Sequence, residues 1–154
     1  MPAILLICTA NICRSPMAEA LMRSKLEEEG LAGDWRVESA GTWASEGHPA
    51  AEFSEGVMQA RGLDISQHRS KGVEGGYLEK FDLILTMERN HKEALRVEFP
   101  ELSDRIYMLS EMAGQKFDIE DPIGGSEAEF DATADEIERL IEAGFEKIRR
   151  LAQN

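Results

Sequence analysis

The sequence predicts an α/β fold built on a doubly wound parallel sheet, in which three layers place helices on both faces of the strands. Segments typical of strands and of helices alternate along the chain, as they do when crossover helices join parallel strands. The run AILLIC at residues 3–8 is continuously apolar, which is expected of a strand buried on both faces. With 154 residues and no repeat or linker, the chain fits a single domain spanning 1–154.

The first strand, at 3–8, leads almost directly into a helix. Ser15 is expected to cap this helix, and Pro16 to occupy its first position, where proline is favoured. The helix is predicted to run to about Glu28, with Gly30 near its end. Its inward-facing apolar residues are Met17, Leu21 and Met22.

Three later segments also have the composition of strands. They are WRVESA at 35–40, FDLILT at 81–86 and RIYML at 105–109. Because helical segments separate them, they are expected to run parallel to the first strand. The carboxyl ends of all the strands then lie at one edge of the sheet, where ligands bind in this architecture.

Three more helices are predicted between and after these strands. One runs from Pro49 to Arg61, and its inward residues are expected to be Phe53, Val57 and Ala60. Asn90 followed by Glu93 resembles a capping box at the start of a short helix. Ser126 followed by Glu129 has the same pattern at the start of the last helix. The apolar residues of that last helix recur at intervals of three and four: Phe130, Ala134, Ile137, Ile141, Phe145, Ile148 and Leu151.

The composition indicates which kinds of partner and which cellular compartment to expect. A formal net charge of −13 leaves no basic face for nucleic acid. No apolar stretch approaches the roughly 20 residues of a membrane span, and no basic segment precedes the first apolar run as in a signal peptide. We therefore expect a cytoplasmic protein with no nucleic acid or membrane partner. The only two cysteines, Cys8 and Cys13, and three scattered histidines match no zinc pattern, so no metal or cofactor is expected.

The segment CTANICRSPMAEA at 8–20 carries the candidate chemistry. In a short loop before a helix, successive backbone N–H groups can converge on an anion, and the helix dipole adds positive charge. Arg14 supplies a planar fork for two oxygens of a tetrahedral anion. Cys8 lies beneath, where this field favours a thiolate that can attack a bound phosphoryl group and form phosphocysteine. The predicted phosphate-binding residues are Thr9, Ala10, Asn11, Ile12, Cys13, Arg14 and Ser15.

This segment also resembles the signature of the low-molecular-weight protein tyrosine phosphatases. The similarity extends through SAGT at 39–42, DISQHRS at 64–70, FDLILTME at 81–88 and DPIGG at 121–125. It implies a four-stranded parallel sheet and a two-step, metal-free hydrolysis of protein phosphotyrosine, with Cys8, Arg14 and Asp121 as catalytic residues. Asp121 would be the general acid that protonates the leaving phenolate. On spacing alone, Asp121 is one carboxylate among several in an acidic run.

The resemblance implies supporting roles as well. Asn11 would brace the loop through bonds to Ser39 and His68. Independently of the resemblance, Ser15 is close enough in the loop to donate a hydrogen bond to the Cys8 thiolate. One residue departs from the family pattern, because Ala10 stands where the family usually has glycine. Alanine is unstrained at this position only if its φ is negative.

The substrate cleft is expected to involve Ile12, Trp43 and Ile123. Family members often have an aromatic residue at the position of Ile123, where it flanks the ring of the substrate. Because Ile123 is not aromatic, this side of the cleft is expected to differ from the family. Trp43 fits the mouth of the cleft, and a half-buried position in a loop fits it equally well. Cys13 is close enough to Cys8 along a curled loop for a reversible disulfide under oxidation.

Other functions remain open at this stage. A thioredoxin-coupled arsenate reductase would need further cysteines in the middle of the chain, and none is present. Relatives that act as protein-arginine phosphatases are similar in the loop but carry threonine at the position of Ile12, and the apolar isoleucine favours a phenyl ring. A phosphate-binding module without turnover, and a packing role for Cys8, are the remaining alternatives. The expected partner is a tyrosine-phosphorylated protein, and the expected state is a monomer or weak dimer.

Overall fold

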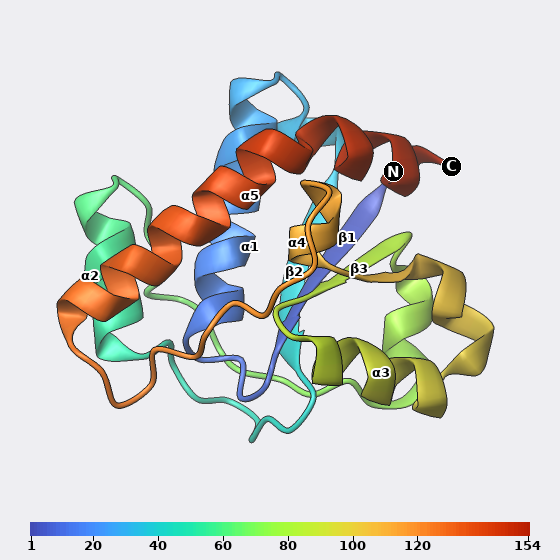
Figure 1. Ribbon diagram of the computed structural model, residues 1–154. Helices are drawn as coiled ribbons and strands as arrows, with labels where there is room; N and C mark the ends of the chain where they lie inside the picture. Colours follow the sequence, from blue (N-terminus) through green and yellow to red (C-terminus); the bar gives the residue numbers. More distant parts are fainter.

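The computed structural model describes residues 1–154 and contains one sheet of four parallel strands in the order β2-β1-β3-β4 (Figure 1). The strands are β1 (Ala3–Cys8), β2 (Arg36–Gly41), β3 (Leu83–Thr86) and β4 (Ile106–Met108). The predicted parallel α/β sheet is therefore confirmed. The boundaries of the last three strands differ from the predicted ones by one or two residues, as strand ends often do.

Helices cover both faces of this sheet. The α-helices are α1 (Arg14–Glu28), α2 (Glu52–Ala60), α3 (Arg89–Glu98), α4 (Leu109–Met112) and α5 (Glu127–Gln153). Three short 3-10 helices join them: η1 (Ala32–Asp34), η2 (Gly75–Lys80) and η3 (Pro100–Arg105). In Figure 1, α1, α2 and α5 lie on one side of the strands and α3 lies on the other.

Alternate residues of β1 enter two separate hydrophobic cores. Ile4 and Leu6 belong to the larger core, which the residues of α1, α4 and α5 complete. Leu5 and Ile7 belong to the smaller core, together with residues of η2, α3 and η3. Each fully buried Leu or Ile side chain contributes about 1.5–3 kcal/mol, so the central strand is held from both faces.

The register of the sheet brings three strand ends to one edge. Cys8, the last residue of β1, lies opposite Gly41, the last residue of β2. Ile7 lies opposite Thr86, the last residue of β3. The segments that follow β1, β2 and β3 therefore start side by side, and the loop from β1 to α1 lies between the other two.

Helix α1 begins earlier than predicted. Arg14 is its first residue and Cys13 is its N-cap, with no side-chain capping bond, so the capping role expected of Ser15 is wrong. Ser15 instead lies in the first turn, where its hydroxyl contacts other residues. Pro16 is the third residue and is tolerated because the N–H groups of the first turn have no acceptor within a helix. The end of the helix at Glu28 agrees with the prediction, as do its buried residues Met17, Leu21 and Met22.

Two predicted core residues of α2 are wrong. Phe53 is 38% exposed and Ala60 is exposed, whereas Val57 is buried as expected. Ser54 takes the inner face in place of Phe53, because its hydroxyl donates a 3.1 Å hydrogen bond to the carbonyl of Cys13. A polar contact with the loop thus turns the helix away from the orientation that its apolar residues predict.

The N-terminus of α3 also differs from the prediction. Its N-cap is Glu88, and the capping box joins Glu88 with His91 rather than Asn90 with Glu93. His91 is buried, with 3% of its surface exposed. A pattern search that requires Glu or Gln at the third position of the helix selects the wrong pair here, because an imidazole nitrogen takes the acceptor role.

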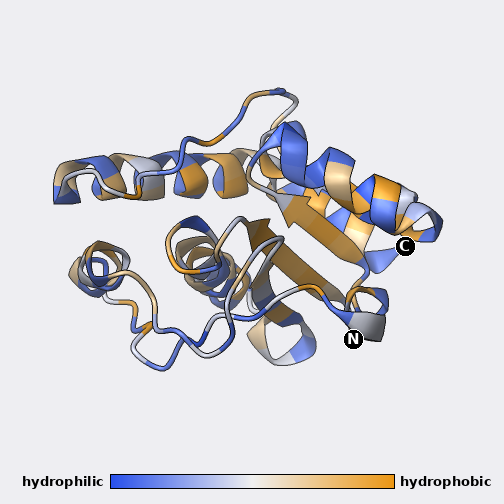
Figure 2. Ribbon diagram, turned by 90° about the horizontal axis from the view of Figure 1, so that it is seen from below, coloured by the Kyte–Doolittle hydropathy of each residue, from blue (hydrophilic) through white to orange (hydrophobic).

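Helix α5 follows the prediction closely. The Ser126 hydroxyl accepts a 3.2 Å hydrogen bond from the backbone N–H of Glu129. The predicted apolar residues of the helix are buried, except that Leu151 is only partly buried. Figure 2 shows predominantly hydrophobic strands at the centre and helices of mixed character along their length. None of the helices has the length and apolarity needed to cross a membrane.

Candidate active site

The loop from β1 to α1, residues 9–14, turns its carbonyl groups outward. The carbonyl oxygens of Thr9 and Ile12 accept hydrogen bonds from the backbone N–H groups of Trp43 (2.9 Å) and Ala51 (2.8 Å). By contrast, the N–H groups of residues 9–13 donate to no acceptor in the protein. Five backbone donors therefore remain free in a loop at the N-terminus of a helix, which is the arrangement of an anion-binding site.

Asn11 holds the middle of this loop in an unusual conformation. It is the only non-glycine residue with positive φ (60°), and it is fully buried. Its side-chain amide donates to Ser39 (3.0 Å) and Ser15 (2.7 Å) and accepts from the backbone of Lys71 (3.0 Å). Its carbonyl accepts a 2.6 Å bond from His68 Nε2. The contacts with Ser39 and His68 that the family resemblance implied are therefore present.

Two small residues let the loop pass close to β2. A Cβ atom at Gly41 would lie 2.4 Å from the carbonyl oxygen of Thr9 and 3.0 Å from the backbone nitrogen of Asn11. Only glycine fits this position, which explains the glycine of the SAGT motif. Ala10 is not among the residues with positive φ, so its methyl group meets the condition under which alanine is unstrained.

The thiol of Cys8 lies beneath the loop and is 2% exposed. Its sulfur is 2.9 Å from the hydroxyl oxygen of Ser15. Because that oxygen already accepts from Asn11 Nδ2, the Ser15 proton is free to point at the sulfur. The hydroxyl of Ser15 is thus placed to stabilise negative charge on Cys8, as the sequence analysis expected.

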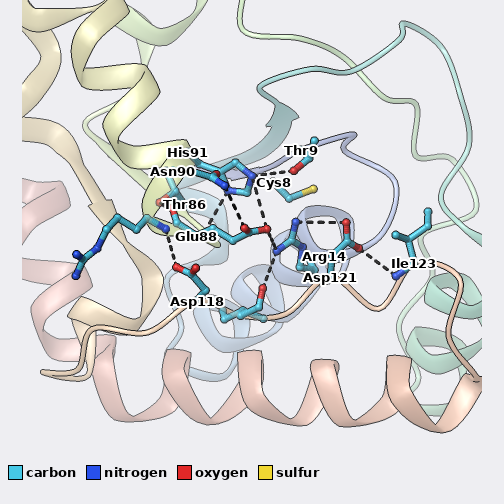
Figure 3. A network of polar contacts seen from close by, with 12 residues as sticks. Cys8, Thr9, Arg14, Thr86, Glu88, Asn90, His91, Asp118, Asp121 and Ile123 are labelled. Carbon is cyan, nitrogen blue, oxygen red and sulfur yellow. Dashed lines mark hydrogen bonds and ion pairs between the residues drawn. The ribbon is translucent and has the colours of Figure 1, made fainter.

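Arg14 closes the site with a guanidinium that is only partly satisfied. Its side chain is 1% exposed, and its Nη1 donates to Glu88 Oε2 (2.5 Å) and to the carbonyl of Ile119 (2.6 Å). Its Nε and Nη2 are buried and have no hydrogen-bond partner. Figure 3 shows this guanidinium between Glu88 and Asp121, beside the sulfur of Cys8. The free edge of Arg14 and the free backbone donors therefore belong to one site.

Asp121 faces the same site from the segment before α5. Its Oδ2 is 3.6 Å from Arg14 Nη2, and its side chain is 37% exposed. Its Oδ1 accepts a 3.1 Å bond from the backbone N–H of Ile123, which fixes the turn (Figure 3). The same segment is tied to the end of β3 by a 2.9 Å bond from the N–H of Ile119 to the carbonyl of Met87. A carboxyl group is thereby held beside the guanidinium of Arg14.

The predicted cleft residues have different degrees of exposure. Ile12 is partly buried and packs against the larger core. Trp43 is 87% exposed, so the half-buried alternative is wrong, and its backbone is bonded to the loop. Ile123 is 56% exposed and leaves one side of the opening without an aromatic ring.

Cys13 has a different environment from Cys8. Both cysteines are free and buried. Burial raises the pKa of the Cys13 thiol to about 12, and the nearby Asp121 carboxylate and the sulfur of Cys8 add to the effect. Cys13 therefore remains protonated at neutral pH and is a poor nucleophile compared with a thiolate.

Two site residues were missed in the sequence analysis. Glu88 holds Arg14, and His91 Nε2 lies 2.8 Å from Thr9 Oγ1. Both follow β3, so a signal existed: polar residues directly after a parallel strand lie at the ligand-binding edge of the sheet. No group of three or more His, Cys, Asp or Glu side chains is placed to hold a metal ion.

A parallel sheet whose central strand ends in this cysteine–arginine loop defines a class of α/β proteins that hold a tetrahedral oxyanion over a thiol. Comparison with known proteins identifies the family within that class. The model of the low molecular weight phosphotyrosine protein phosphatases matches residues 3–154, and the chain belongs to that family. The family indicated by the sequence motifs is therefore confirmed.

Three relatives illustrate the range of the similarity. The chain is 37% identical over 148 residues to a probable low molecular weight protein-tyrosine-phosphatase, EpsP, of Ralstonia nicotianae, covering 96% of this chain and 97% of the relative. It is 37% identical over 147 residues to a protein-arginine-phosphatase of Geobacillus stearothermophilus, covering 95% of each. A crystal structure of a low molecular weight protein tyrosine phosphatase from T. tengcongensis superposes with a TM-score of 0.90 at 38% identity, covering 96% and 99% of the two chains.

Proposed function

We propose that this chain is a protein tyrosine phosphatase that hydrolyses phosphotyrosine through a cysteinyl-phosphate intermediate. The observation that carries the proposal is the buried guanidinium of Arg14, which lies beside the thiol of Cys8 and whose Nε and Nη2 have no hydrogen-bond partner. Each buried donor left unpaired costs about 1–3 kcal/mol. A phosphoryl dianion removes this cost by accepting from Arg14 and from the free N–H groups of residues 9–13.

In the first step, the Cys8 thiolate attacks the phosphorus atom in line with the tyrosine oxygen. The new bond is S–P, and the bond that breaks joins phosphorus to the phenolic oxygen. Asp121 donates its proton to the departing oxygen, which leaves as neutral tyrosine. The hydroxyl of Ser15, 2.9 Å from the sulfur, stabilises the thiolate before attack. Arg14 and the loop amides hold the three equatorial oxygens of the transferred group.

In the second step, water attacks the phosphocysteine. Asp121, now a carboxylate, accepts a proton from that water, the S–P bond breaks, and inorganic phosphate forms. The thiolate of Cys8 is regenerated and no electrons are exchanged with another reactant. Asn11 supports both steps, because its four polar contacts keep the loop amides directed inward between turnovers.

The opening of the site favours an aryl substrate. Ile12 and the exposed Trp43 and Ile123 offer apolar surface for a phenyl ring, although Ile123 provides less than an aromatic side chain. We expect phosphoserine to be disfavoured, because its shorter side chain would hold phosphorus farther from Cys8 than the longer tyrosine side chain does. The tyrosine phosphatase name of the Ralstonia relative agrees with this preference.

A second candidate function is removal of phosphate from arginine, which the name of the Geobacillus relative suggests. The guanidinium of phosphoarginine needs a polar neighbour when it leaves water, and Ile12 offers none. Arsenate reduction through a disulfide relay is the weaker alternative, because the chain has only two cysteines, Cys8 and Cys13. We therefore favour tyrosine over arginine as the phosphorylated residue.

We also propose that Cys13 protects Cys8 from irreversible oxidation. Peroxide would convert the Cys8 thiolate to a sulfenic acid. Cys13 lies near enough for the Cys8 sulfur to act on its pKa, so its thiol, although protonated, would attack the sulfenic sulfur at short range. The Cys13 proton and the sulfenic hydroxyl would leave as water, and a disulfide would form. This chemistry suits an enzyme of a reducing compartment such as the cytoplasm, where thiols can restore it. After peroxide treatment, mass spectrometry should find a Cys8–Cys13 bridge that dithiothreitol reverses. Sulfinic acid at Cys8 without any bridge would refute the protective role.

The test of the proposed function is release of nitrophenol from p-nitrophenyl phosphate in the presence of EDTA. We expect turnover by the wild type and severe loss in Arg14→Lys, because an ammonium cannot contact Glu88 and also present a fork to the phosphoryl group. His48→Asn serves as a control variant, since this exposed side chain makes no polar contact. Absence of wild-type turnover, with phosphate still bound, would instead support a binding module.

A further inference from the structure

The first turn of α3 contacts both ends of the 9–14 loop. Glu88, the N-cap, holds Arg14 at the end of the loop through a 2.5 Å ion pair. His91, the third residue of the helix, holds Thr9 at the start of the loop, with 2.8 Å between His91 Nε2 and Thr9 Oγ1. Figure 3 shows both contacts made from this one turn. The distance between the two ends of the loop therefore depends on α3.

The direction of the His91 contact follows from its other ring nitrogen. The backbone N–H of Glu88 donates a 3.2 Å bond to His91 Nδ1, so Nδ1 carries no proton. In the neutral ring the proton is then on Nε2, which donates it to the oxygen of Thr9. Burial lowers the pKa of His91 below its ordinary value of 6.5 and outweighs the nearby Glu88 carboxylate, which acts in the opposite direction. The ring is accordingly neutral at pH 7.

We infer that His91 is a positioning residue, which fixes Thr9 and thereby holds the start of the anion-binding loop at the correct distance from Arg14. This inference rests on the proposed phosphatase function and assigns His91 no contact with the substrate. The imidazole suits the task because it is rigid and uses both nitrogens, one in the capping box and one on the loop. It is 3% exposed, so water does not compete for either bond.

The contact can be broken from either side. Thr9→Val keeps the shape of the side chain and removes the acceptor. His91→Asn keeps an oxygen near the position of Nδ1, for the capping bond, but its nitrogen ends short of Thr9. His91→Gln restores that reach and can still cap, because glutamine is a common third residue in capping boxes. His48→Asn, at an exposed histidine, is the matched control.

Two quantities should be measured for each variant: kcat/KM for a phosphotyrosine peptide, and the dissociation constant of inorganic phosphate by calorimetry. We expect Thr9→Val and His91→Asn each to lower kcat/KM and weaken phosphate binding about tenfold, the effect of losing one hydrogen bond. The double variant should be no worse than either single one. His91→Gln should recover to within about threefold of the wild type, and His48→Asn should match it.

The inference is overturned if the two single effects multiply in the double variant, if His91→Asn behaves as wild type, or if His91→Gln fails as badly as His91→Asn. Thr9→Val keeps the inference testable even if a His91 variant does not fold. The phosphate measurement separates this inference from the proposed function. If the wild type hydrolyses no phosphotyrosine but the variants show the same coupled losses of phosphate binding, the proposed function is refuted and the positioning role of His91 is retained.

Discussion

At the scale of the residue, Asp121 has a position that leads to a specific kinetic expectation. Its Oδ2 lies 3.6 Å from Nη2 of Arg14, the residue proposed to hold the phosphoryl oxygens. Asp121→Asn should therefore slow hydrolysis of phenyl phosphate, with its poor leaving group, at least tenfold more than that of p-nitrophenyl phosphate. The comparison requires kcat for both esters with both enzymes. Equal slowing of both esters would make Asp121 a structural residue.

The neighbouring carboxylate provides a matched control for that comparison. Glu120 is exposed, precedes Asp121 directly and makes no hydrogen bond or ion pair. Glu120→Gln removes the same charge from the same segment. It should leave both rates close to wild type, so that a change specific to Asp121→Asn reports proton transfer and not the local field.

Ile12 carries a second expectation at this scale. We predict a kcat/KM for phosphotyrosine peptides at least tenfold above that for phosphoarginine and phosphoserine peptides, which is about 1.4 kcal/mol. Ile12→Thr should narrow the gap to phosphoarginine, because its hydroxyl can pair with a guanidinium. Ile12→Val introduces a side chain with the shape of threonine but no hydroxyl, and it should leave the gap to phosphoarginine unchanged. Wild-type enzyme that cleaves both peptides equally fast would disprove the argument from Ile12.

Some site residues could be predicted from the sequence and others could not, for a physical reason. Cys8 and Arg14 belong to one short loop, so their spacing alone indicates the chemistry. Glu88 and His91 lie 74 and 82 positions from the residues that they contact, and only the register of β3 beside β1 brings them together. Trp43 shows the same limit, because composition does not determine whether a loop tryptophan is buried.

At the scale of the element, two glycines in helices test how the helices pack. A Cβ atom at Gly144 of α5 would lie 2.6 Å from Met112 Cβ and 2.8 Å from the Met112 backbone at the end of α4. Gly144→Ala should destabilise the protein by about 1–3 kcal/mol, because two packed helices must move apart. Gly56 of α2 has nothing within 4 Å of its Cβ position. Gly56→Ala should stabilise by about 0.5–1 kcal/mol through helix propensity.

Urea unfolding of Gly144→Ala, Gly56→Ala and the wild type gives the change in the free energy of unfolding for each variant, and this measurement checks both predictions. Both substitutions add one methyl group to a helix, so propensity acts equally on them and the difference between them reports the contact of α4 with α5. If both variants are stabilised alike, α5 does not pack against α4 at Met112.

Element boundaries were the least predictable feature at this scale. The helix at 127–153 was predicted well, since its apolar spacing and its Ser126 cap agree. The start of α1 was not, because the bonds of the loop, rather than a capping side chain, determine where the helix begins. The inner face of α2 was misassigned because Ser54 bonds to the loop. Both errors lie beside the active site, where polar contacts outweigh local propensity.

At the scale of the whole molecule, the formal net charge of −13 does not prevent binding of an anionic substrate, because the distances over which charges act differ. Exposed charges are screened over a Debye length of about 8 Å at physiological ionic strength. Arg14 and the free backbone donors act at contact within a buried loop. A local positive site can therefore bind a phosphoryl dianion on an acidic protein.

The topology was predictable from the order of the elements. Alternating strands and helices allow few arrangements, because crossovers between parallel strands are right-handed. The central place of β1 follows from its continuous apolar sequence, which needs helices on both faces and strands on both edges. The location of the loop at the end of this strand then identifies where ligands bind.

The central claim, that phosphate passes through Cys8, can be tested directly by trapping the intermediate. Wild-type enzyme mixed with p-nitrophenyl phosphate and quenched in acid within one turnover should carry one phosphoryl group, which peptide mass spectrometry should locate on Cys8. Cys8→Ser should show no turnover while still binding inorganic phosphate. A phosphoryl group on any other residue, or turnover by Cys8→Ser at the wild-type rate, would contradict the account.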